Sequence, residues 1–147
     1  MKTMIFCFLL SLGTAITLLG QNTPADLKSE ADFMTALMKM ARYPRSAQQA
    51  GKVAKVYVNF SVETNGHIGN VNVLNENAVD PAFSVAVKQL MSKLPDQKPA
   101  YAGAYVLPII FELEGQNGKT EQPKEGQPLD VPSGQTLLNE LVVVAYK

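Results

Sequence analysis

The chain has 147 residues, of which 46% are hydrophobic, and its 13 basic residues balance its 13 acidic residues. This length suits one compact domain with some additional tail and is too short for two ordinary domains. Balanced charge without a block of either sign excludes the basic surface by which proteins bind nucleic acid or anionic membranes. His67 and Cys7 are the only histidine and cysteine, so a metal cluster or a nucleophile–histidine pair has no second member. We therefore expect a protein that is not an enzyme and that uses no metal or cofactor.

The first twenty residues have the layout of a secretory signal. Lys2 precedes an apolar run over residues 4–19, and Gly20 with the polar residues after it completes the pattern. Cleavage after Gly20 would remove Cys7 and leave a secreted chain without a thiol. The alternative is a retained membrane anchor, because the length of this run lies near the lower limit for a helix that spans a bilayer.

Two helices are predicted before the first strand. Residues 23–24, Thr-Pro, resemble a helix cap followed by the first helical position, and apolar residues then recur at helical spacing over 27–41. The Tyr-Pro pair at 43–44 breaks this pattern because the residue before a proline is pushed out of the helical region. A short second helix over 44–50 would end at Gly51.

A β-hairpin follows. Apolar and polar residues alternate over 54–63, which predicts a half-buried strand, and the strand ends at an Asn-Gly pair, the strongest short-range hairpin signal. A two-residue loop sets the register, so that Val58 faces Val73 and Ser61 faces Asn70. Apolar residues then meet apolar residues on one face of the hairpin.

The last element of the domain is a strand with a proline in it. After a third helix that begins at Asp80-Pro81 and ends before Pro95, apolar residues alternate over 105–114. Because Pro108 cannot donate a backbone hydrogen bond, we place this strand at a sheet edge with the missing donor on the unpaired side, and a free edge can accept another strand. The whole order predicts an α+β fold with helices packed on one face of a small three-stranded antiparallel sheet.

The composition changes after Glu114. Residues 115–135 are rich in glycine, glutamine and proline, which predicts a flexible linker. Residues 136–147, here called the tail, form an apolar strand-forming run that is an aggregation hazard unless it pairs with something. We thus divide the chain into a signal or anchor over 1–20, a domain over 21–114, the linker and the tail.

Motifs along residues 33–113 occur in a characteristic order: a Tyr-Pro opening, a strand–turn–strand and a closing Leu-Pro-Ile. They are carried by Tyr43, Pro44, Ala47, Gly51, Val56, Val58, Phe60, Val62, Asn65, Gly66, Ile68, Val71, Val73, Asp80, Ala82, Leu94, Pro95, Lys98, Pro99, Gly103, Leu107, Pro108, Ile109 and Phe111. Together they resemble the C-terminal domain of TonB proteins. The resemblance implies helices packed on a three-stranded sheet whose last strand pairs with a TonB box, a short extended segment of an outer-membrane receptor.

The chain departs from the family pattern in three ways. Gln97 stands where tryptophan is common, and Ala54 stands where glycine is common. The long proline-rich spacer of a complete transducer is missing, because only residues 21–23 separate the apolar run from the first predicted helix. We therefore do not expect this chain alone to cross the periplasm and transmit force.

The resemblance assigns a strand acceptor and a strand donor to the same chain. The receptor-binding strand would consist of Val106, Leu107, Pro108, Ile109, Ile110, Phe111, Glu112 and Leu113. The tail is similar to a TonB box of receptors of the starch-utilisation class through Leu138, Glu140, Leu141, Val142, Val143, Val144 and Tyr146. A flexible linker of this length would allow the tail to reach its own edge strand.

The function implied is a periplasmic domain that captures TonB boxes of outer-membrane receptors by strand addition, as part of energy-dependent transport across the outer membrane. The tail would act as an internal competitor or as a handle for another TonB protein, and no nucleic acid or small-molecule substrate is expected. Two alternatives stay open: copies that exchange their tails to form dimers or chains, and a membrane-anchored transport or signalling subunit.

Overall fold

The computed structural model describes residues 27–115, 119–124 and 129–147. The predicted signal or anchor, the predicted helix start at 23–24 and parts of the predicted linker lie outside these residues. Among the described residues, no helix is both long and apolar enough to cross a membrane.

The helical part of the described chain consists of α-helices and short 3-10 turns. They are η1 (Leu27–Ser29), α1 (Ala31–Met40), α2 (Arg45–Gln49), η2 (Glu76–Ala78), α3 (Pro81–Ser92) and η3 (Pro99–Tyr101). The prediction of one continuous first helix is wrong for the residues before Ala31, because Glu30 has an extended backbone between η1 and α1. The start of α3 is confirmed: Asp80 Oδ1 accepts a hydrogen bond of 2.9 Å from Ala82 N, and Pro81 fills the first turn.

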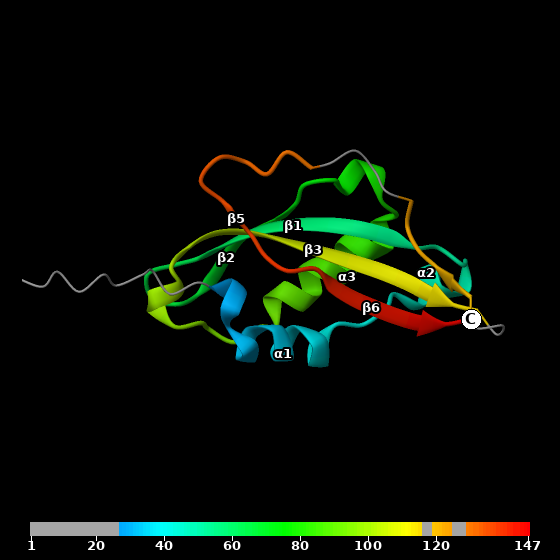
Figure 1. Ribbon diagram of the computed structural model, residues 1–147, viewed down its shortest axis with the longest axis horizontal. Coiled ribbons are helices and arrows are strands. Elements are labelled where there is room, and N and C mark those ends of the chain that lie inside the picture. Colours follow the sequence, from blue (N-terminus) through cyan, green and yellow to red (C-terminus); the bar gives the residue numbers. More distant parts are fainter. Residues whose placement is uncertain (1–26, 116–118, 125–128) are drawn as a thin grey trace, which may run out of the picture.

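The sheet is larger than the sequence predicts. Its strands are β1 (Ala54–Val62), β2 (Ile68–Val73), β3 (Gly103–Glu114), β4 (Thr120–Glu121), β5 (Thr136–Leu137) and β6 (Leu141–Tyr146). The order is β2-β1-β3, and β5 and β6 pair in parallel along the side of β3 that faces away from β1 (Figure 1). β4 pairs antiparallel with Leu113 and Glu114 on the opposite side of β3, beyond the end of β1. The prediction of three antiparallel strands is therefore wrong. The tail supplies the extra parallel strands because docking pairs its backbone and buries its apolar side chains.

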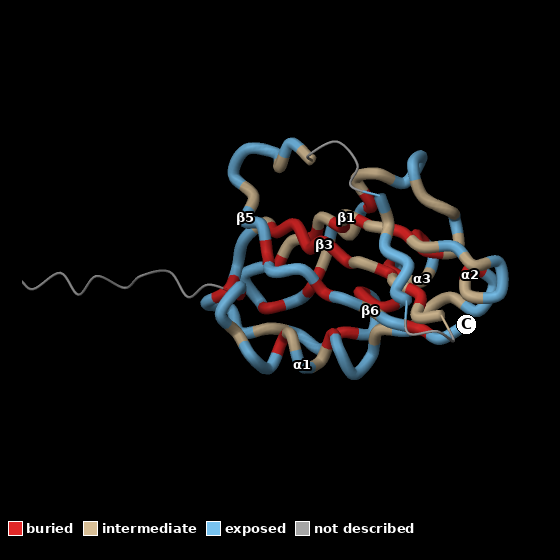
Figure 2. Tube along the Cα trace, turned by 45° about the vertical axis from the view of Figure 1, so that its right-hand side comes forward, coloured by how far each residue is buried: buried red, intermediate tan, exposed pale blue. Residues whose placement is uncertain are grey.

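The core lies between the sheet and the helices. Buried residues gather along β1 and β3 (Figure 2), where alternate side chains such as Val56, Val58 and Phe60 meet those of α1 and α3. Phe33 of α1 lies 6.0 Å from Phe60 between ring centroids, and Phe83 of α3 lies 4.9 Å from Phe111. The predicted α+β class is thus correct at the level of a mixed fold with helices packed on a multi-stranded sheet.

The hairpin register is confirmed in one half and wrong in the other. Val58 faces Val73 as predicted, but Ser61 faces Gly69 because the register shifts by one residue before the turn. Asn70 occupies the shift with a φ of 53°, and its side chain donates a 2.8 Å hydrogen bond to Ser61 Oγ. A β-bulge therefore replaces the regular pairing that a two-residue loop predicts.

The hairpin turn docks closely against the loop after α3. Gly66 has a φ of 90°, its carbonyl accepts a 2.7 Å hydrogen bond from Gln97 N, and a Cβ at this position would lie 1.9 Å from Gln97 O. We expect Gly66→Ala to lower the free energy of unfolding by about 2–4 kcal/mol, measured by urea denaturation. Gly134→Ala is the matched control because Gly134 also has a positive φ, of 81°, but nothing within 4 Å; it should cost only about 1 kcal/mol. Equal losses would contradict the role assigned to the close contact.

Candidate functional site: the outer edge of β3

The predicted receptor-binding strand forms most of β3. Leu107, Ile109 and Phe111 belong to the hydrophobic core under the helices. The alternate residues Val106 and Pro108 point to the other face of the sheet and are also buried, whereas Ile110, Glu112 and Glu114 on that face are partly exposed. β3 thus has one wholly apolar face and one mixed face.

The backbone groups of β3 that face away from β1 belong to its even-numbered residues. Val106 O accepts a 2.8 Å hydrogen bond from Leu138 N, and Glu114 O accepts one of 2.9 Å from Lys147 N. Pro108 is one of these even-numbered residues, and its partner on β1 is Tyr57. The backbone of Tyr57 forms its hydrogen bonds away from β3: its N–H donates to Asn75 Oδ1, and its C=O accepts from Leu74 N. The missing donor of Pro108 therefore faces the outer edge, which the tail covers.

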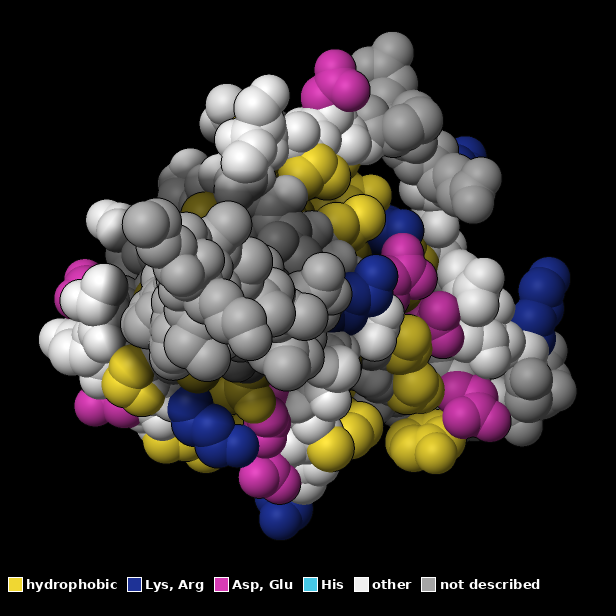
Figure 3. Space-filling view, turned by 60° about the vertical axis from the view of Figure 1, so that its left-hand side comes forward, with side chains coloured by type: hydrophobic (Ala, Val, Ile, Leu, Met, Phe, Trp, Pro, Cys, Tyr) yellow, Lys and Arg dark blue, Asp and Glu magenta, His cyan; other side chains and the backbone are white. Residues whose placement is uncertain are grey.

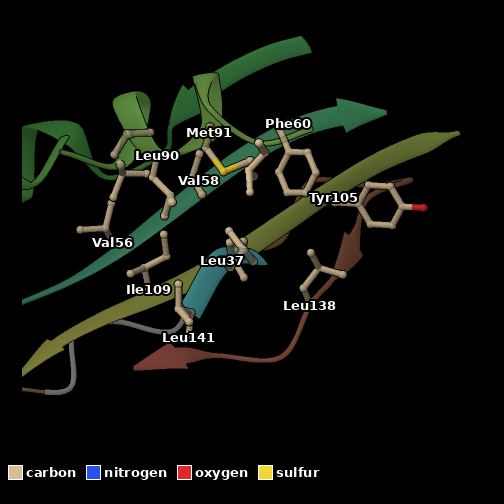
Figure 4. Packing of buried hydrophobic residues seen from close by; sticks show 14 of the residues in the cluster. Leu37, Val56, Val58, Phe60, Leu90, Met91, Tyr105, Ile109, Leu138 and Leu141 are labelled. Atoms are coloured by element: carbon tan, nitrogen blue, oxygen red, sulfur yellow. The ribbon is translucent and has the colours of Figure 1, made fainter. Parts of the chain in front are cut away.

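The tail occupies this edge in parallel orientation. Tyr105 and Val106 pair with β5, and the stretch from Ile109 to Glu114 pairs with β6. Leu138 and Leu141 are only 3% and 2% exposed, and Figure 4 shows Leu141 beside Ile109 and Leu37. The two leucines complete the core from outside the predicted domain.

The register of the tail changes opposite Pro108. Val106 faces Leu137 and Ile109 faces Leu141, so Leu107 and Pro108 are matched by three tail residues. Those three are Leu138, Asn139 and Glu140. The extra residue is a bulge in the docked strand, and it places Leu138 and Leu141 on the core side although they are three positions apart.

Polar contacts fix the tail at three points. Glu140 Oε1 lies 2.5 Å from Lys55 Nζ, and this hydrogen bond raises the pKa of Lys55. Gln48 Nε2 donates a 2.8 Å hydrogen bond to Tyr146 O, and Lys147 Nζ lies 2.7 Å from Glu121 on β4. The side chains of both ion pairs are partly exposed, so the pairs contribute orientation more than stability.

An aromatic cluster packs under the C-terminal half of β3. The Tyr43 ring meets Phe83 and Phe111 edge-on at centroid distances of 5.8 Å and 5.5 Å, and its hydroxyl donates to Lys52 O. Burial raises the pKa of Tyr43 to about 12, and the nearby negative charge of Glu121 adds to the shift. The hydroxyl is therefore a permanent donor at physiological pH.

One apolar row of the tail stays in solvent. Val142, Val144 and Tyr146 are 48%, 46% and 69% exposed, on the sheet face that points away from the helices. In the space-filling view, hydrophobic side chains adjoin acidic ones along the right-hand side of the molecule (Figure 3). Only one face of the docked tail therefore packs against the core.

The described residues contain no group of three or more His, Cys, Asp and Glu side chains placed to hold a metal ion. His67 lies in the exposed hairpin turn, where its Nδ1 is 3.1 Å from Asp96 Oδ1. Sequence reasoning missed Lys55, Gln48 and the bulge. The outward position of Lys55 follows from strand alternation, but its pairing with Glu140 requires the tail register, which no short-range pattern gives.

The chain matches the family model described as Gram-negative bacterial TonB protein C-terminal, over residues 39–113. No curated protein and no solved structure matches it. The matched stretch runs from the end of α1 to Leu113, the next-to-last residue of β3, and covers half of the chain. The chain therefore belongs to the TonB C-terminal family, whose members are periplasmic, non-enzymatic domains that take part in energy transduction and interact with outer-membrane receptors.

Proposed function

We propose that the outer edge of β3 captures TonB boxes of outer-membrane receptors by strand addition, and that the tail competes with them for this edge. The observation that carries the proposal is the parallel docking of the tail on residues 105–114. An edge that pairs with one extended apolar segment offers the same backbone acceptors and the same apolar core surface to another. The tail is then an example of the kind of strand that fits.

Capture requires that the tail leave. Its attachment consists of two short ladders, the buried side chains of Leu138, Leu141 and Ala145, and a few exposed polar contacts. The chain joins it to the domain through the predicted linker. A tethered competitor acts at an effective concentration on the order of 1 mM, so an incoming segment must bind more tightly than the tail or be presented at high local concentration. The tail thereby sets a threshold for capture.

A peptide with the sequence of residues 136–147, added to the isotope-labelled full chain, tests the proposal by NMR. The unlabelled peptide should displace the labelled tail with a midpoint on the order of 1 mM. Signals of β6 amides should move to positions typical of a disordered chain, while signals of β3 amides shift only slightly. If the signals of the β6 amides stay unchanged at a peptide concentration tenfold above this midpoint, the result would argue against capture.

Backbone N-methylation gives a matched pair of control peptides. Lys147 N donates to Glu114 O, so from Leu141 to Lys147, after the bulge, the odd-numbered residues direct their N–H groups toward β3 and the even-numbered ones direct theirs away. A peptide methylated at the position of Val143 should lose displacement by at least about tenfold. A peptide methylated at the position of Val144 should behave like the parent.

A further inference from the structure

We infer that the β3 edge selects strands that carry a bulge: two large aliphatic residues three positions apart, with an acidic residue directly before the second. This inference rests on the proposed capture of strands and specifies which strands are captured. In the tail the three positions are Leu138, Glu140 and Leu141. Pro108 and Lys55 of the domain are the residues that select for this pattern.

Pro108 explains the spacing. A regular parallel strand would bring a ligand carbonyl to the position where an N–H of residue 108 would donate, and proline has none. A carbonyl held there in a regular strand would lack its partner, which costs about 1–3 kcal/mol where water is excluded. The extra residue between Leu138 and Leu141 lets the backbone turn away at this point while both side chains still reach the core.

Lys55 explains the acidic residue. Its ammonium lies on β1, on the sheet face away from the helices, 5.7 Å from the Tyr57 ring centroid and 2.5 Å from Glu140 Oε1. The bulge is the part of the docked strand that Lys55 contacts. A basic residue at the position of Glu140 would meet a like charge, so Lys55 discriminates between segments by charge.

Deletion of Asn139 in the full chain tests the spacing. The deletion is made both in the chain with Pro108 and in the Pro108→Ala chain, so that its effects in the two backgrounds can be compared. The measurement is hydrogen exchange of the β6 amides. With Pro108 present, the deletion should lower protection of these amides at least about fivefold, because the regular strand meets no donor. In the Pro108→Ala chain, which supplies the donor, the deletion should have little effect. Equal loss or no loss in both backgrounds would overturn the spacing rule.

Peptides provide the second measurement. The test of the spacing uses the unmutated chain, so that its result does not depend on how the variants fold. The peptide of residues 136–147 should displace the tail at a concentration at least about fivefold lower than the same peptide without its asparagine. A lysine in place of its glutamate should weaken displacement about fivefold, and Lys55→Glu should reverse that preference. If all peptides displace the tail equally, the selection rule fails while capture stands. If none displaces it but the deletion cycle behaves as expected, the rule holds for the tail and capture of outside strands fails.

Discussion

A disulfide that ties β6 to β3 is expected to abolish displacement of the tail by added peptide, raising the peptide concentration required at least about a hundredfold. Glu112 and Val144 face each other across these strands, with side chains on the face away from the core. Neighbouring strands lie about 4.8 Å apart, which suits a disulfide between facing cysteines. The variant is Glu112→Cys with Val144→Cys, with Cys7→Ser in every chain so that no other thiol competes.

The oxidised and reduced forms of this variant provide the comparison. After reduction the tail should be displaced at the concentration that the unmodified chain requires, as measured by the signals of the β6 amides. A disulfide at Asn59→Cys with Asn72→Cys, a facing pair between β1 and β2, is the control because it joins strands away from the tail. Its oxidised form should still lose its tail to peptide. Displacement that is the same in oxidised and reduced Glu112→Cys/Val144→Cys chains would mean that the peptide binds elsewhere.

Ile109→Ala is expected to lower the free energy of unfolding by about 2–5 kcal/mol, since Ile109 is fully buried between β1 and β6. The double variant Leu138→Ala with Leu141→Ala removes two equally buried side chains, yet it should cost less than twice that amount. The reason is that the tail can detach as a unit, so the loss cannot exceed the free energy with which the tail docks.

Urea denaturation with hydrogen exchange distinguishes the two cases. In the double variant, amides of β6 should exchange nearly as fast as in an unfolded chain, while amides of β1 keep most of their protection. In Ile109→Ala, all of these amides should lose protection together. Should the double variant unfold the entire domain, the tail would be an inseparable part of the core, and its displacement by a receptor segment would be too costly to occur.

Local chemistry was sufficient to predict several elements. Asp80 and Pro81 mark the start of α3 because a carboxylate cap and a proline act within one turn. Pro108 predicted a strand at a sheet edge with the missing donor on the unpaired side. The donor position does face away from β1, but the prediction of a free edge is wrong because β5 and β6 pair along that side of β3. Alternation along β1 separated the core side chains from those, such as Lys55, on the other face.

The features that the sequence did not predict depend on contacts between distant segments. The hairpin register shifts at Asn70, where a positive φ and a bond to Ser61 replace the regular pair. The docking of the tail depends on the balance between burial of Leu138 and Leu141 and the cost of ordering the chain that precedes them. Periodicity reports which residues are able to form a strand, but neither its partner nor its direction.

The parallel direction of the tail has a mechanical consequence. Tyr101 contacts Glu30 just before β3 begins, whereas Lys147 bonds to Glu114 where β3 ends, so the two ends of the described chain lie at opposite ends of the sheet (Figure 1). Tension between the N-terminal end of the domain and the C-terminal end of a strand docked like β6 therefore runs along the strands. Such a load is shared by all rungs of the ladder at once, whereas a pull from the other end of the docked strand would open them one after another.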